Sequence, residues 1–173
     1  QGGKLSLKIE KPETSCAVFS KDNIQDLEVW WTPLEEMVDI LKIQYIDPDP
    51  EYKWQKMYAL AEGATEVEDG KTVYVGSRRE QPLIKEVEMF GVTNFSQSAR
   101  LAWFYLNQAN LCNKWVKFKT NRLALDRTVG DVIALDNHIL GEAKLYRIVN
   151  MVEAEGGRFE LTCRIYNPDI YND

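Results

Sequence analysis

The chain has 173 residues and 45% hydrophobic content, enough for one sizeable core or two small ones. Its 21 basic and 27 acidic side chains give a net charge of −6, which argues against nucleic acid or an anionic membrane as the main partner, because both bind basic surfaces. No apolar run approaches the roughly 20 residues of a transmembrane helix, so we expect no membrane insertion. The chain begins at Gln1 without an initiator Met or a signal peptide, and we expect a processed or excised fragment.

The first ninety residues predict strands separated by turns. Alternating apolar and polar residues predict a half-buried strand over residues 4–10, before Pro12 interrupts the pattern. Residues 34–38 fit a short helix or a loop, and the acidic, Gly-containing residues 62–71 predict a surface loop or hairpin end. Further strands are predicted over residues 27–31, 40–46, 54–61, 72–75 and 83–90.

One segment, about residues 94–108, predicts the single long helix. Thr93 or Asn94 is a natural N-cap, because its side-chain oxygen can accept a hydrogen bond from an otherwise unpaired backbone N–H. The predicted buried stripe, at helical spacing, consists of Phe95, Ala99, Ala102, Trp103, Leu106 and Ala109.

Three apolar residues of this helix, Leu101, Phe104 and Tyr105, fall off the predicted stripe. One interpretation is a helix that is buried on two sides within one domain. The other is an apolar patch that contacts a neighbouring subunit or domain. We therefore take these three residues as the candidate interface.

The remainder of the chain returns to the two-residue alternation of apolar and polar side chains that is typical of strands. Strands are predicted over residues 114–120, 132–135, 144–153 and 158–166, with Glu155-Gly156-Gly157 as a hairpin signal. Gly130 and Asp131 fit a structural turn better than catalysis. The predicted fold is α+β and mainly antiparallel, a β-sandwich or barrel with one flanking helix. We expect residues 1–173 to be a single fragment, with a possible soft boundary near residues 62–70 or around Pro33.

Carboxylates at Asp47, Asp49 and Glu51 have the alternate spacing of a calcium loop. Such a loop also needs a glycine at its sixth position and a glutamate at its twelfth, where this chain has Tyr52 and Tyr58. A solvated turn is therefore the favoured interpretation, and no metal site is predicted.

No catalytic or cofactor-binding residue is predicted, and no cofactor is expected. The sole histidine, His138, lies in a polar loop, and no nucleophile elbow or phosphate-binding loop is present. Glu35 and Glu36 are the best acidic pair, but adjacent residues do not face each other across a substrate. The cysteines are odd in number and far apart, so we expect them to be reduced and mostly buried: Cys16, Cys112 and Cys163.

An ordered set of motifs resembles the tail-tip or baseplate-hub proteins of long-tailed phages, the host-specificity protein J type. The resemblance covers most of the chain and is strongest over residues 84–171. Ser98 departs from it, because a small apolar residue is expected there. The motifs are Gly91-Val92-Thr93, Gln97-Ser98-Ala99-Arg100, the strand from Trp115 to Phe118, Gly130-Asp131-Val132-Ile133, Tyr146-Arg147-Ile148-Val149 and Tyr166-Asn167-Pro168-Asp169-Ile170-Tyr171.

The resemblance implies a virion structural protein and not an enzyme. It implies a homotrimeric hub, with tube-like β-barrel domains, that closes the distal end of the tail tube for host attachment and DNA delivery. The implied partners are a second and third copy of the chain, the distal tail ring and the tape-measure protein. The implied location is the virion tail, with assembly in the host bacterial cytoplasm. A tail-associated cell-wall hydrolase and a carbohydrate-binding β-sandwich remain as alternatives.

Overall fold

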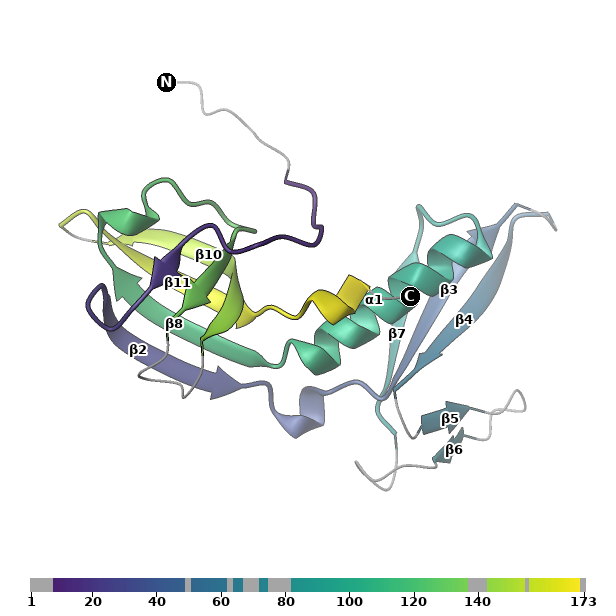
Figure 1. Cartoon of the computed structure of the whole chain (residues 1–173). Coiled ribbons are helices and arrows are strands. Elements are labelled where there is room, and N and C mark those ends of the chain that lie inside the picture. Colours follow the sequence, from purple (N-terminus) through teal and green to yellow (C-terminus); the bar gives the residue numbers. More distant parts are fainter. Residues whose placement is uncertain are drawn as a thin grey trace. The chain divides into compact units, whose positions relative to one another are not determined.

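The computed structural model describes residues 8–48, 51–61, 64–66, 72–74, 82–136, 143–154 and 156–171, with the backbone alone for residues 64–66 and 72–74. The chain divides into two compact units (Figure 1). Unit 1 contains Gln1–Trp31 and Asn113–Tyr171, and unit 2 contains Thr32–Cys112 with Asn172–Asp173. Each unit has its own hydrophobic core, as expected of a separately folded body.

Unit 1 is built on a six-stranded sheet with the order β1-β9-β10-β11-β8-β2, which is curled in Figure 1. Only the pairing of β1 with β9 is parallel. Two short 3-10 helices, η2 (Arg122–Ala124) and η3 (Pro168–Tyr171), belong to the same unit. The strands are β1 (Val18–Phe19), β2 (Ile24–Trp31), β8 (Lys114–Thr120), β9 (Val132–Leu135), β10 (Lys144–Ala154) and β11 (Arg158–Ile165).

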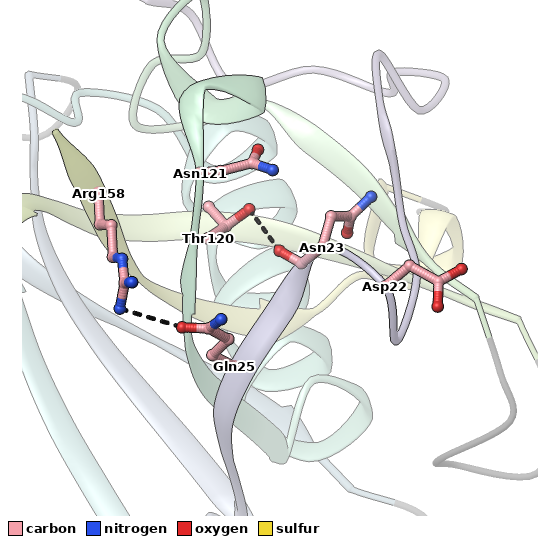
Figure 2. A pocket seen from close by; sticks show the side chains of 6 residues that line it. All are labelled: Asp22, Asn23, Gln25, Thr120, Asn121 and Arg158. Atoms are coloured by element: carbon pink, nitrogen blue, oxygen red, sulfur yellow. Dashed lines mark hydrogen bonds between the residues drawn. The ribbon is translucent and has the colours of Figure 1, made fainter. Parts of the chain in front are cut away.

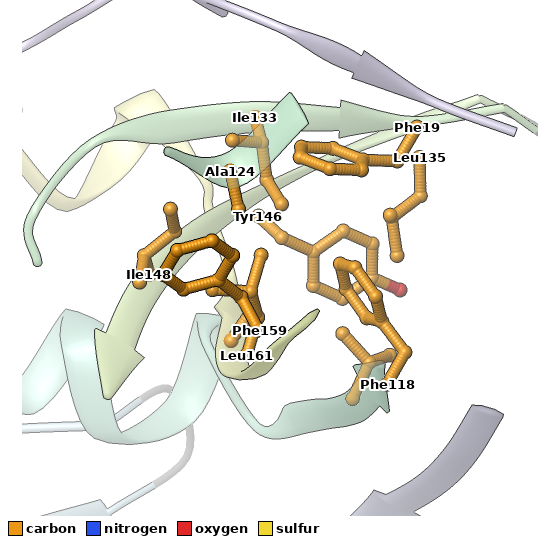
Figure 3. Packing of buried hydrophobic residues seen from close by; sticks show 11 residues of the cluster. Phe19, Phe118, Ala124, Ile133, Leu135, Tyr146, Ile148, Phe159 and Leu161 are labelled. Carbon is orange, nitrogen blue, oxygen red and sulfur yellow. The ribbon is translucent and has the colours of Figure 1, made fainter. Parts of the chain in front are cut away.

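The inner face of this curled sheet forms the core of unit 1 (Figure 3). Alternate residues of each strand point inward, because successive side chains of a strand lie on opposite faces. The rings of Phe19 and Phe118 pack in a tilted arrangement with their centroids 5.5 Å apart. The core is completed by fully buried residues of β8 and of the other strands: Val116, Ile133, Leu135, Tyr146, Ile148, Leu161 and Cys163.

Two predicted turns in unit 1 have the expected glycine conformations. Gly156 and Gly157 have φ angles of 80° and 70°, which L-residues with a side chain rarely adopt, and they join β10 to β11 as predicted. Gly130 has a φ of 95°, and its N–H donates to the Ile148 carbonyl over 2.8 Å. Asp131 Oδ2 accepts from the Thr128 N–H over 2.9 Å. Gly130 and Asp131 are therefore turn residues that attach this loop to β10.

Unit 2 is a three-stranded sheet with a helix on one face (Figure 1). Strand β3 (Ile40–Asp47) lies in the middle, antiparallel to β4 (Lys53–Leu60) and parallel to β7 (Ile84–Met89). Helix α1 (Phe95–Leu111) covers the face that carries Leu41, Ile43 and Tyr45 of β3. The unit also contains η1 (Leu34–Glu36) and a two-stranded sheet of β5 (Ala64–Glu66) and β6 (Thr72–Tyr74).

The predicted fold class, mainly antiparallel β with one helix, is confirmed. The predicted strand over residues 4–10 is not supported where it can be checked, because residues 8–10 form no strand. They are held instead by side-chain ion pairs, Lys8 with Asp131 and Glu10 with Arg147. The single-fragment prediction and its soft boundary near residues 62–70 stay predictions.

Candidate interaction surfaces

Helix α1 begins where the sequence predicts. Asn94 has extended backbone angles, and its Oδ1 accepts from the Gln97 N–H over 2.7 Å, so it is the N-cap. The helix continues to Leu111, three residues beyond the predicted end. Its far end is fixed by the Asn110 amide, which donates to the Val38 carbonyl over 3.0 Å. The cap at Asn94 is local to the helix, whereas the Asn110 bond ties the end of α1 to the segment that precedes β3.

The buried side of α1 differs from the predicted stripe. Its fully buried residues are Ser98, Ala102 and Leu106, whereas Phe95 is 60% and Trp103 38% exposed. The prediction that Trp103 lies in the core is therefore wrong. Small side chains let the helix approach the sheet closely, so Ser98 and Ala102 face β3 and β4 while the bulky aromatic rings point away.

The predicted interface residues lie on α1 in three different environments. Leu101 packs partly against the core of unit 2, Phe104 is half-buried, and Tyr105 is 44% exposed. The rings of Phe104 and Tyr105 meet edge to face with centroids 5.4 Å apart. We name Leu101, Phe104 and Tyr105 the outer patch of α1; their role as an interface stays a proposal.

The opposite face of the unit 2 sheet carries a second group of apolar side chains. Trp54 of β4 lies opposite Ile46 of β3, and its ring meets that of Phe90 edge to face at 5.6 Å. Trp54 is 45% and Phe90 73% exposed. The side chains at this end of the sheet, on the side away from α1, are named the open face. They are Gln44, Ile46, Trp54, Lys56, Glu88 and Phe90.

Unit 1 carries a row of aromatic and cationic side chains on the outer face of its sheet. Trp30, Trp115 and Arg164 are neighbours on β2, β8 and β11. The two indole rings stack with centroids 6.2 Å apart and planes inclined by 8°, and the Arg164 guanidinium lies 5.2 Å from the Trp115 ring centroid. The sequence does not reveal this row, because alternation gives the face of each residue but not the register between strands.

A second cation lies at the same end of β8. The Lys114 ammonium is 5.2 Å from the Trp31 ring centroid. Burial and the nearby positive charge of Lys144 lower the pKa of Lys114. Trp115 thus has a neighbour on each side, Trp30 and Arg164.

Arg147 of β10 contacts both the N-terminal and the C-terminal segment of unit 1. Its guanidinium donates to the Lys11 carbonyl and to the Tyr171 hydroxyl over 3.0 and 2.9 Å, and pairs with Glu10 at 3.2 Å. It also lies 5.0 Å from the Tyr166 ring centroid. Burial is the main cause that raises the pKa of Tyr171 to about 12, so its hydroxyl stays protonated at neutral pH.

A small polar recess in unit 1 is shown in Figure 2. Its volume is about 60 Å³, far below the roughly 300 Å³ of the smallest usual ligand pockets. Two of its polar groups bond each other, since the Thr120 hydroxyl donates to the Asn23 carbonyl over 2.8 Å. Arg158 donates to the Gln25 amide oxygen over 3.1 Å. This recess has room for water and no more.

The candidate acids of the sequence are scattered. Glu35 and Glu36 are exposed on η1, and Asp47 is the last residue of β3. No group of three metal-ligating side chains occurs within the part of the chain that the structure describes; Asp49 and His138 lie outside it. Likewise, none of the described helices is long and apolar enough to cross a bilayer.

All three cysteines are free thiols, but they differ in exposure. Cys112 and Cys163 are buried as expected, whereas Cys16 is exposed. Burial raises the pKa of the Cys163 thiol to about 12. Only Cys16 is therefore accessible to reagents in the folded chain.

Comparison with protein families gives a match over residues 14–151, to the family described as "Putative phage tail protein". This match covers most of the chain. A comparison with curated protein sequences finds no match.

Several solved structures share the fold. A chain in the virion of a native gene transfer agent particle superposes with a TM-score of 0.68 at 14% identity, over 91% of this chain and 33% of its own. A tail protein from Neisseria meningitidis MC58 gives 0.56 at 9% identity, over 92% and 46%. A 43 kDa tail protein of prophage MuSo2 from Shewanella oneidensis gives 0.50 at 10% identity, over 95% and 47%. This chain thus spans less than half the length of each of these proteins.

Proposed function

Since the chain belongs to this family of phage tail proteins, we propose that it forms part of a trimeric hub at the distal end of the tail tube, for host attachment and DNA delivery. The family match over residues 14–151 is the observation that supports the proposal most. The likeness in fold to tail proteins and to a virion chain supports the same architecture.

A structural and non-enzymatic role fits the surfaces of the chain better than catalysis. A hydrolase of glycosidic bonds needs two carboxyl groups that face each other within about 10 Å. The best acidic pair of the sequence, Glu35 and Glu36, consists of adjacent exposed residues on η1. The described surfaces instead offer exposed aromatic side chains, which are typical of protein interfaces.

The proposed partners are two further copies of the chain, the distal tail ring and the tape-measure protein. The proposed locations are the tail of the virion and, during assembly, the cytoplasm of the bacterial host. The outer patch of α1, Leu101, Phe104 and Tyr105, is the proposed contact with a neighbouring subunit or hub domain. Aromatic side chains are enriched in such contacts and contribute much of their energy.

Two measurements on the full-length protein test the hub. The first is its mass in solution by light scattering, where a hub gives three copies. The second is gold labelling of isolated tails with an antibody to this chain, where a hub gives label at the distal tip alone. Label along the tube or at the capsid end, or a full-length protein that stays monomeric in assembled tails, would contradict the proposal.

A further inference from the structure

We propose that residues 8–13 form a strap that detaches from unit 1 as one piece when its ion pairs are screened, and that its detachment uncovers Arg147. This segment, drawn in purple ahead of β1, forms no strand (Figure 1). Five of its six residues are exposed, and Glu13 is half-buried. The proposal concerns unit 1 by itself and does not depend on the proposed hub.

The strap is held mainly by charged side chains. At its start, Lys8 pairs with Asp131 of the turn before β9. Further along, Glu10 pairs with Arg147 of β10 at 3.2 Å, and the same guanidinium donates to the Lys11 carbonyl over 3.0 Å. Ion pairs at the surface each contribute little free energy and are weakened by salt, so a strap held in this way is sensitive to ionic strength.

The strap has neither strand pairing nor apolar burial to hold it more firmly. Its one large apolar side chain, Ile9, is exposed. The Glu13 N–H donates to the Tyr166 hydroxyl over 3.0 Å, which is a bond to a side chain and not to a neighbouring strand. The hydrophobic core of unit 1 contains no residue of the strap, so detachment leaves the core intact.

The chain is anchored differently from Cys16 onward. The Cys16 N–H donates to the Val132 carbonyl of β9 over 2.8 Å, and Phe19 is fully buried in the core. These contacts do not depend on charge. Residues 14–15 lie between the two kinds of anchor and are exposed, so the strap turns about them while β1 stays in place.

Detachment changes the surface of unit 1 around Arg147. With the strap in place, the Arg147 side chain is only 14% exposed. Its guanidinium also lies 5.0 Å from the Tyr166 ring centroid and donates to the Tyr171 hydroxyl, and neither of these groups belongs to the strap. The guanidinium therefore keeps its position after Glu10 leaves. A guanidinium held in this way is a suitable donor for a carboxylate, and the closed strap occupies the site with its own.

Hydrogen exchange of single amides, measured by NMR on the whole chain, tests the detachment. The Glu13 amide reports on the strap, and the Cys16 amide reports on the segment that enters β1. Between about 20 mM and about 1 M sodium chloride, the protection of Glu13 should fall severalfold while that of Cys16 changes less than about twofold.

Three results of this measurement would overturn the proposal. The first is a Glu13 amide that is unprotected already at low salt, because the strap would then not be closed in solution. The second is a Glu13 protection that does not depend on salt. The third is an equal loss of protection at Glu13 and Cys16, which would show that β1 leaves together with the strap.

A matched pair of variants separates the ion pairs from a general effect of charge. Lys8→Met removes both ion pairs of Lys8, with Asp131 and with Glu13. Lys11→Met removes the same charge from a side chain that has no ion pair within the described part of the chain. At low salt, Lys8→Met should bring the exchange of Glu13 close to the high-salt rate of the unsubstituted chain, and Lys11→Met should leave it unchanged. Equal exchange in the two variants would overturn the proposal.

Reaction of arginines with phenylglyoxal, followed by peptide mapping, measures whether Arg147 is uncovered. Arg147 should react severalfold faster in Lys8→Met than in the unsubstituted chain. Arg122, which is exposed on η2, is the internal reference and should react equally in both. Faster exchange of Glu13 without faster reaction of Arg147 would show that the strap does not cover this site, and the proposal would be wrong.

Discussion

The two units bury the faces of their β-sheets in different ways. Unit 1 curls a six-stranded sheet so that its inner face forms a core of its own, to which Ala124 of η2 also contributes. Unit 2 has only three strands in its main sheet and relies on a separate helix to cover one face. A curled sheet needs few additional elements, whereas a three-stranded sheet with one helix leaves its second face for solvent or for a partner.

The units differ in charge as well. Unit 1 contains 13 basic and 13 acidic side chains and is neutral, whereas unit 2 contains 8 and 14 and carries the whole net charge of −6. Opposite charges in unit 1 are paired across strands, as in Lys117 with Glu160 at 3.0 Å and Lys119 with Asp26 at 2.8 Å. Unit 2 therefore carries the excess of negative charge.

A substitution in the core of unit 1 has the largest expected effect on stability. Phe118 is fully buried against Phe19, so Phe118→Ala should lower the free energy of unfolding by about 3–5 kcal/mol. Chemical denaturation measures the loss, and hydrogen exchange along the chain locates it. If unit 2 loses protection as much as unit 1, the two units unfold as one body and the comparison fails.

A substitution in the core of unit 2 has the next largest expected effect on stability. Leu106 is 2% exposed on the inward side of α1, so Leu106→Ala should cost about 2–5 kcal/mol. Trp103→Ala is the control on the same helix and should cost only about 1 kcal/mol, because the ring is partly exposed. A larger loss for Trp103 than for Leu106 in urea denaturation would show that the helix face is wrongly assigned.

A substitution in the turn before β9 tests a backbone constraint in unit 1. Gly130→Ala should destabilise by about 1–2 kcal/mol, since alanine is strained at a φ of 95° and its Cβ would lie 3.0 Å from Lys8 Cδ. Gly91→Ala is the control, because an added Cβ there meets nothing within 4 Å. Equal melting temperatures for the two variants would contradict this account.

Substitutions at the N-cap of α1 test the stability of the helix of unit 2. Asn94→Ala removes the acceptor of the Gln97 N–H and should cost about 1 kcal/mol. Asn94→Asp should retain the stability, because a carboxylate accepts the same bond and is favourable at a helix N-terminus. Loss of stability in both variants by thermal denaturation would show that the side chain acts in another way.

The smallest effect concerns pH and the ion pair between Lys8 and Asp131. Burial raises the pKa of Asp131, but hydrogen bonds from Lys8 and Thr128 outweigh it and hold the pKa below the usual 3.8. Because the folded pKa is depressed, this stabilisation is present above the unfolded pKa of about 3.9 and is lost as pH falls through the folded pKa. Asp131→Asn should flatten the fall of the melting temperature below about pH 4. An unchanged slope would mean that the ion pair contributes nothing.

Local patterns of residues are enough to predict the elements whose signal lies within a few positions. The cap at Asn94, the hairpin at Gly156 and Gly157 and most of the period-two strands depend on residues near one another in the chain, and the structure has them close to where they are predicted. The strand predicted over residues 4–10 is the exception, because residues 8–10 form no strand. The inward set of β3, Leu41, Ile43 and Tyr45, follows from the same alternation.

Which surfaces meet depends on contacts between segments that are distant in the chain. Apolar residues lie almost all around α1, so its buried side depends on what the opposing sheet can accept. The sheet accepts Ser98 and Ala102 at close approach and leaves Trp103 outside. The stack of Trp30, Trp115 and Arg164 likewise depends on the register of three strands that are distant in sequence, which no local pattern encodes.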